Sequence, residues 1–129
     1  MARAYTLATA ALALATPLKW LDNILSHHHV LGVEQKRQGI ARRLSIDGLL
    51  VLGIALILMR EIGLPARRAI ETAQYLAKNN GIYKFEQLSL SIDLNAFRDE
   101  LLGKLESAVE IAPVPKRGRP GENKTGRLD

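Results

Sequence analysis

Basic and amide side chains are the groups in this chain best suited to chemistry, and the first set shares one regular spacing. Lys19, Asn23 and Ser26 recur at i, i+4 and i+7, so they would lie on one face of a helix. Lysine can donate hydrogen bonds to guanine O6 and N7, and asparagine can pair with the N6 and N7 edge of adenine. This face therefore predicts base reading in the major groove of DNA. A solvated polar helix face is the alternative.

A second group of cations surrounds a glycine. Lys36 and Arg37 precede Gly39, and Arg42 and Arg43 follow it, which predicts a β-hairpin with a basic tip. Cations at such a tip neutralise phosphates, which positions a protein on DNA but carries little sequence information. Because side chains alternate along a strand, we expect one of Arg42 and Arg43 to meet DNA and the other to lie along the protein. An exposed hairpin without a partner is the alternative.

A third basic group lies near the end of the sequence. Residues 115–120 resemble an AT-hook, whose core is the sequence Arg-Gly-Arg-Pro. In such a motif the arginines enter a narrow, A·T-rich minor groove, while glycine allows close approach and proline keeps the chain extended. The residues predicted to contact DNA here are Lys116, Arg117, Gly118, Arg119 and Pro120.

The composition limits the classes of function. The 129 residues carry 18 Lys and Arg against 13 Asp and Glu, a formal net charge of +5. The positive charge lies in residues 1–44 and 113–129, on either side of a slightly acidic middle, and this distribution fits a polyanionic partner. Since there is no cysteine, a disulfide scaffold, a thiolate metal site and a cysteine nucleophile are excluded. An aromatic content of 5% argues against a stacking platform for single strands.

Catalytic and metal-binding patterns are not evident. The sequence has no nucleophile elbow, phosphate-binding loop, dinucleotide-binding turn or metalloprotease motif. The three consecutive histidines, 27–29, would point in different directions on a helix, so they are poorly placed to share one metal ion. A helix end or turn is predicted there. We therefore predict a protein that is not an enzyme and holds no cofactor or metal.

Two apolar segments must be distinguished from targeting signals. Arg3 followed by Leu7–Ala15 imitates a signal peptide, but the segment is mostly alanine and is interrupted by threonine, which favours an ordinary helix. The apolar run 48–59 is shorter than the ~20 residues that span a bilayer, so it predicts a buried helix. We expect a cytoplasmic, nucleoid-associated protein with no membrane partner. A secreted small basic protein is the alternative.

Short helices and strands must position these side chains. Thr16 and Ser45 are expected N-caps, Gly63 ends a helix, and Pro65 opens the next one. Hydrophobic periodicity and turn residues predict helices over 7–15, 17–26, 46–62 and 65–78, and hairpin strands over 30–33 and 40–44.

Beyond a break at 79–81, residues 87–92 alternate and predict a strand with one buried face. Asp93 then caps a last helix over 94–111, and from Pro113 the composition predicts a disordered tail. The last helix has an apolar stripe of Leu94, Phe97, Leu101, Leu105 and Ala108. The strand and the stripe are candidate dimer surfaces, and packing on the chain's own core is the alternative.

The order helix, turn, helix, basic hairpin, helix, helix resembles the winged-helix DNA-binding domain of the MerR family. The resemblance covers residues 5–78 and is carried by four loose motifs. These are Tyr5-Thr6-Leu7 before the Ala-rich helix, Leu18-Lys19-Trp20-Leu21-Asp22, the segment from Gly39 to Asp47, and Arg60-Glu61-Ile62-Gly63-Leu64. The resemblance implies a winged helix-turn-helix in which the second helix enters the major groove and the wing contacts phosphates.

The sequence also departs from that family. The three histidines lengthen the segment before the wing, and Ile40-Ala41-Arg42-Arg43 stands where one Tyr-Arg is usual. No long coiled-coil helix follows Lys78, and no effector domain or cysteine ligand is present. Effector sensing of the metal or redox kind is therefore not expected, whereas the DNA-binding half of the resemblance remains.

The sequence thus predicts a mainly α fold with a small β wing, in three parts. Residues 1–80 form the winged helix-turn-helix, 81–112 a strand and helix suited to dimerisation, and 113–129 the basic tail. The expected function is that of a bacterial or phage-type transcription regulator that binds double-stranded DNA as a homodimer. The alternative is a protein-interaction adaptor or antitoxin-like module on the same fold, which grips its partner with residues 81–112 and exposes apolar surface there.

Overall fold

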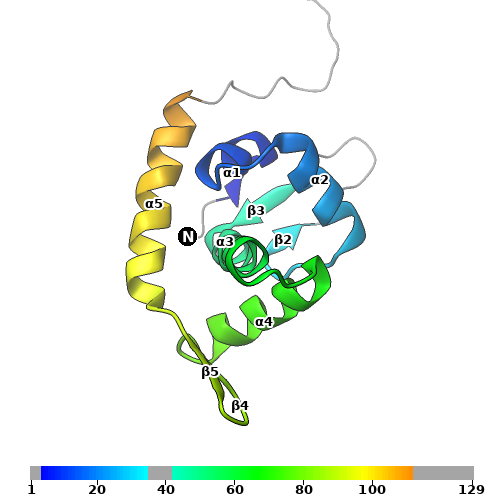
Figure 1. Ribbon diagram of the computed structural model, residues 1–129. Helices are drawn as coiled ribbons and strands as arrows, with labels where there is room; N and C mark the ends of the chain where they lie inside the picture. Colours follow the sequence, from blue (N-terminus) through cyan, green and yellow to red (C-terminus); the bar gives the residue numbers. More distant parts are fainter. Residues whose placement is uncertain (1–3, 35–41, 112–129) are drawn as a thin grey trace, which may run out of the picture.

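The chain is mainly helical with two small antiparallel sheets, as seen in a computed structural model that describes residues 4–34 and 42–111 (Figure 1). This confirms the predicted mainly α class with a small β component. The first half contains the strands β1 (Ala4–Tyr5), β2 (Val33–Glu34) and β3 (Arg43–Ser45) and the helices α1 (Leu7–Ala13) and α2 (Leu18–His27). The second half contains α3 (Ile46–Ile57), a π-helical turn η1 (Leu58–Ile62), α4 (Ala66–Lys78), β4 (Ile82–Phe85), β5 (Leu88–Ser91) and α5 (Leu94–Ile111).

The first sheet has the order β1-β3-β2 and is antiparallel throughout. Leu44 in the central strand β3 lies opposite Tyr5 of β1 and Val33 of β2, and its side chain is fully buried. The antiparallel pairing expected for the hairpin is therefore present between residues 33–34 and 43–45, while the tip between these strands lies outside the described residues. The N-terminal strand β1 was not predicted, because a two-residue strand has too little alternation to be recognised.

Helix starts follow the local capping residues at one site and not at another. Ser45 caps α3 as predicted, with its hydroxyl accepting a hydrogen bond from the amide of Gly48 at 3.1 Å. The prediction for Thr16 was wrong: Pro17 is the N-cap of α2 and provides no side-chain cap. Ala15 adopts a left-handed conformation with φ 55°, and the tight turn instead uses the Thr16 amide, which donates to the carbonyl of Ala11 at 3.0 Å.

α3 forms the centre of the core, as the apolar run predicted. All its residues from Gly48 to Leu56 are buried. The predicted continuous helix over 46–62 is wrong in its last turn, where the chain widens into η1 before Gly63, at φ 80°, ends it. In the parts of the chain that the structure describes, no helix is long and apolar enough to cross a membrane.

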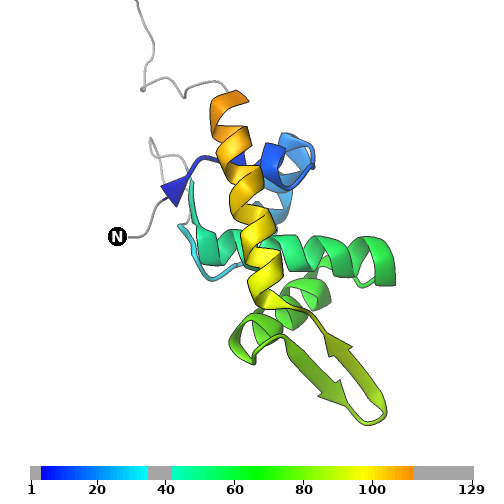
Figure 2. The ribbon, with the colours of Figure 1, turned by 90° about the vertical axis from the view of Figure 1, so that its left-hand side faces the viewer.

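The strand predicted over 87–92 is one arm of a projecting hairpin. β5 pairs with β4, and Figure 2 shows the pair extending away from the rest of the molecule. Tyr83 and Leu90 at its base pack against the core, whereas Phe85 and Leu88 near its tip are 58% and 55% exposed. The expectation of a buried face therefore holds only at the base, because the tip extends past the body that would cover it.

α5 packs along the chain's own core beside α1 (Figure 1). Leu101, Leu105 and Ala108 of its apolar stripe are buried, and Phe97 lies over Gly53 of α3, where a β-carbon would come within 2.9 Å of its ring. The stripe therefore packs within the chain, as the alternative prediction had it, and α5 lies against the alanine-rich helix α1.

Candidate nucleic-acid interface

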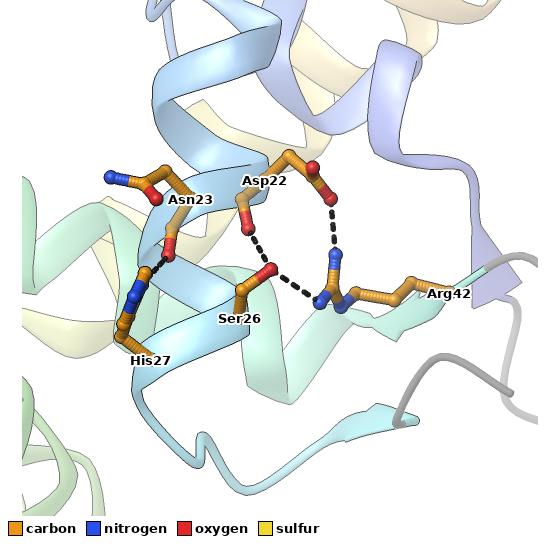
Figure 3. A network of polar contacts seen from close by, with 5 residues as sticks. All are labelled: Asp22, Asn23, Ser26, His27 and Arg42. Atoms are coloured by element: carbon orange, nitrogen blue, oxygen red, sulfur yellow. Dashed lines mark hydrogen bonds and ion pairs between the residues drawn. The ribbon is translucent and has the colours of Figure 1, made fainter.

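The polar side of α2 is divided into two rows. Leu21 and Leu25 bury one side of the helix in the core. Directly opposite, Lys19, Asn23 and His27 follow one another at i, i+4 and i+8 and are exposed, and we call them the outer row. Asp22 and Ser26 form a second row beside it, turned toward the start of β3 (Figure 3). The predicted base-reading residues are therefore on the helix as expected, but they do not share one environment.

The side chain of Arg42 contacts both residues of the second row. Its Nη1 donates to Oδ1 of Asp22, and its Nη2 donates to Oγ of Ser26 at 3.0 Å (Figure 3). The Arg42 side chain is 6% exposed, whereas that of Asp22 is 44% exposed. Charge-assisted hydrogen bonds of this kind are stronger than neutral ones, so the guanidinium ties the end of the basic tip to the middle of α2.

Ser26 is engaged on both of its hydrogen-bonding sides. While it accepts from Arg42, its hydroxyl donates to the main-chain oxygen of Asp22 at 2.8 Å. A hydroxyl has one proton to give, so that donor is already used within the protein. All three residues predicted to read bases are exposed, but the Ser26 hydroxyl is used within the protein, which leaves Lys19 and Asn23 as the better placed donors.

Arg42 and Arg43 lie in different environments, as their alternation predicted. Arg43 is exposed on β3, across from Glu34 of β2, while Arg42 is buried against α2. The Nε atom of Arg42 is buried and has no hydrogen-bond partner among the described residues. One cation is therefore available to a phosphate and its neighbour is used inside the fold.

The remaining predicted contacts lie outside the described residues. These are Lys36 and Arg37 of the hairpin tip and Lys116, Arg117, Gly118, Arg119 and Pro120 of the tail.

The sequence did not predict the contacts that Asp22 and His27 make. Asp22 precedes Ser26 by one turn and so marks a second polar row, but its partner lies twenty positions away and has no local signal. His27 ends α2, and its Nδ1 lies 2.8 Å from the main-chain oxygen of Asn23. Within residues 4–34 and 42–111, no group of three or more His, Cys, Asp or Glu side chains is arranged to hold a metal ion.

Comparison with protein-family models, with curated proteins and with solved structures found no match for this chain. The resemblance to MerR proteins therefore stays a prediction from the motifs in residues 5–78. What α2 and β3 can bind follows from their own side chains: an exposed lysine and amide on a helix, with an arginine on the adjoining strand.

Proposed function

We propose that this protein is a DNA-binding transcription regulator with a MerR-like winged helix-turn-helix. In this proposal α2 enters the major groove, and β3 with the basic tip before it contacts phosphates. The observation that carries the proposal is the contact of Arg42 with Asp22 and Ser26. Because it joins the end of the tip to α2, the outer row and Arg43 belong to one rigid unit. The order of the elements along the chain also supports the proposal: two helices, an antiparallel strand pair and two further helices.

The division of labour in this proposal follows from exposure. Lys19 and Asn23 read base edges, since their polar groups are exposed, and Arg43 neutralises a phosphate. Ser26 and Arg42 act as positioning residues, because their polar groups bind each other and Asp22. The segment 115–120 adds a contact in an A·T-rich minor groove, as its resemblance to an AT-hook implies.

Fluorescence anisotropy of the full-length protein with labelled duplexes, over a range of salt concentrations, tests this proposal. Binding should weaken as salt rises, and Lys19→Ala should weaken it further. Lys104→Ala is the matched control, since it removes an exposed lysine on α5, outside α2 and both strand pairs. A folded protein that binds no duplex at about 50 mM salt, or equal effects of the two lysine variants, would overturn the proposal.

The tail contact needs its own variant in the complete chain. Arg117→Ala together with Arg119→Ala should abolish any preference for A·T-rich over random duplexes and leave binding to the latter largely intact. An unchanged preference in the double variant would show that the tail does not read the minor groove.

We further propose that the regulator is a homodimer joined through the β4–β5 hairpin. Phe85 and Leu88 are exposed, and the strand β5 has no charged residue to protect its edge, unlike β4 with Lys84. Antiparallel pairing of β5 with its copy would place the apolar faces of both hairpins on the same side of one sheet. A twofold dimer doubles the DNA contact and requires a two-part operator site.

The same exposed tip favours the second candidate function, an adaptor or antitoxin-like module that binds another protein. Size-exclusion chromatography with light scattering across a concentration series distinguishes the two. The dimer predicts a mass that doubles as concentration rises and a Phe85→Ser variant that stays monomeric. A wild-type protein that is monomeric throughout, yet binds hydrophobic dye through this tip, favours the adaptor.

A further inference from the structure

His27 completes the outer row of α2. It lies one helical turn after Asn23, which itself lies one turn after Lys19, and all three side chains are exposed. This row faces directly away from Leu21 and Leu25, which bury the other side of the helix. A ligand that reaches Lys19 and Asn23 from solvent therefore meets His27 along the same line.

One hydrogen bond determines which form of the imidazole is presented. Nδ1 of His27 lies 2.8 Å from the main-chain oxygen of Asn23 (Figure 3). A carbonyl oxygen only accepts hydrogen bonds, so Nδ1 must carry the proton. In a neutral imidazole the other nitrogen, Nε2, is then an acceptor. The same bond also fixes the direction of the ring, which lowers the entropy lost when Nε2 meets a donor.

We propose that Nε2 of His27 accepts a hydrogen bond from the exocyclic amino group of adenine or cytosine in the major groove. His27 is then a specificity-determining residue next to Asn23. Adenine N6 and cytosine N4 are the donors that these bases present in that groove, whereas guanine and thymine present only acceptors there. The inference rests on the DNA binding proposed above. It assigns a base preference to a position that Lys19 and Asn23 leave undetermined.

The surroundings of His27 leave Nε2 open to such a donor. The end of α2 and the start of α4 border a hollow lined by Arg67, Ile70, Glu71 and Gln74 together with the three histidines. Arg67 contacts Glu71 at 3.5 Å, so the two charged groups facing this hollow are paired with each other. The residues of α2 that Arg42 contacts are Asp22 and Ser26, not His27.

The test begins with selection of bound sequences from randomised duplexes by the full-length protein. Wild type, His27→Ala and the control His29→Ala, which removes an exposed imidazole beyond the end of α2, are compared. His27→Ala should lose the preference for adenine or cytosine at one position, while His29→Ala retains the wild-type profile. His27→Gln should restore part of that preference, because its side-chain oxygen is again an acceptor.

A second step removes the amino group from the DNA. Replacing adenine by unsubstituted purine, or cytosine by pyrimidin-2-one, at the selected position should weaken wild-type binding about 5- to 150-fold. His27→Ala should bind the altered and unaltered duplexes equally. Which of the two replacements matters identifies the base. Circular dichroism verifies that each variant is folded.

Each other outcome has a distinct meaning. An unchanged profile for His27→Ala overturns the role of His27 but leaves DNA binding standing. A uniform loss over all sequences identifies a phosphate contact and also overturns base reading. A folded wild type that binds no duplex overturns both proposals. Nitrogen NMR of the His27 ring tests the tautomer without DNA. A proton on Nε2 instead of Nδ1 in the neutral imidazole overturns the inference directly.

Discussion

Two antiparallel strand pairs, the short β2–β3 and the longer β4–β5, meet the rest of the molecule in different ways. The first is joined by β1, buries Leu44 in the core and is tied to α2 through Arg42. The second has no further strand among the described residues, and its tip extends into solvent with Phe85 and Leu88 exposed. Both pairs are antiparallel, but the first is held by more of the neighbouring elements than the second.

The two strand pairs are suited to different tasks. An isolated two-stranded hairpin is marginally stable in water, so β4–β5 depends on its base, where Tyr83 packs edge-to-face on Tyr75 of α4 with ring centroids 5.2 Å apart. Such a hairpin can adapt to a partner. β2–β3 is held in place by β1 and by the contact of Arg42 with α2, as the proposed DNA-contacting surface would require.

Truncating a leucine in each pair should give the largest contrast. Leu44→Ala removes a fully buried side chain, and we expect a loss of about 2–5 kcal/mol in the free energy of unfolding. Leu88→Ala removes a side chain that is 55% exposed and should cost less than about 1 kcal/mol. Urea denaturation of both variants measures the contrast. Equal losses would mean that the hairpin tip is covered in solution.

Removing the buried guanidinium should have the next largest effect. Arg42→Ala breaks hydrogen bonds to Asp22 and Ser26, and we expect a loss of about 2 kcal/mol. The cost stays moderate because the half-exposed Asp22 carboxylate can be hydrated by solvent. Arg43→Ala, the exposed neighbour, should change stability by about 0.5 kcal/mol at most. Chemical denaturation of the two arginine variants would contradict the role of Arg42 if they were equally stable.

Two serines offer a smaller contrast. The hydroxyl of Ser45 accepts from the amide of Gly48 and donates to the carbonyl of Gly32 at 2.9 Å, so it joins β3, α3 and the turn before β2. Ser45→Ala should cost about 1 kcal/mol. Ser89→Ala, on the exposed face of β5, should be close to neutral. Thermal unfolding of both variants provides the comparison, and a neutral Ser45→Ala would contradict the capping assignment.

The two strand pairs should also differ in the wild-type protein, in the free energy of local opening. In amide hydrogen exchange, the amides of β4 and β5 should open with a free energy well below that of global unfolding. The amide of Leu44 should exchange only when the whole protein unfolds. Equal protection of both strand pairs would mean that the hairpin is part of the same cooperative unit.

Local signals explain what the sequence predicted correctly. Ser45, Gly63 and Asp93 act on their own neighbourhoods, so the ends of α3, η1 and α5 could be assigned from them. The hairpin β4–β5 was only half predicted, because its turn contains Glu86 at φ 54° instead of a glycine or asparagine. The π-helical turn η1 has no sequence signature, and the apolar stripe of α5 could not reveal which surface would cover it.

In the candidate site, too, the features with a local sequence signal were predicted, and those that depend on contacts formed on folding were not. The exposure of Lys19 and Asn23 followed from their spacing on an amphipathic helix. The burial of Arg42 did not, because the choice between Arg42 and Arg43 depends on where Asp22 lies after folding. The orientation of the His27 ring depends on a main-chain oxygen, which every residue possesses and which therefore leaves no mark in a sequence.

The packing of α5 beside α1 has a consequence for how the protein is made. Residues 7–13 are synthesised well before residues 94–111, which complete the cover of their buried alanines and emerge only after the whole intervening chain. On the ribosome α1 therefore waits with part of its apolar side uncovered, and the core closes when α5 arrives. A nascent chain that stalls before residue 94 would present that side to chaperones or to other chains.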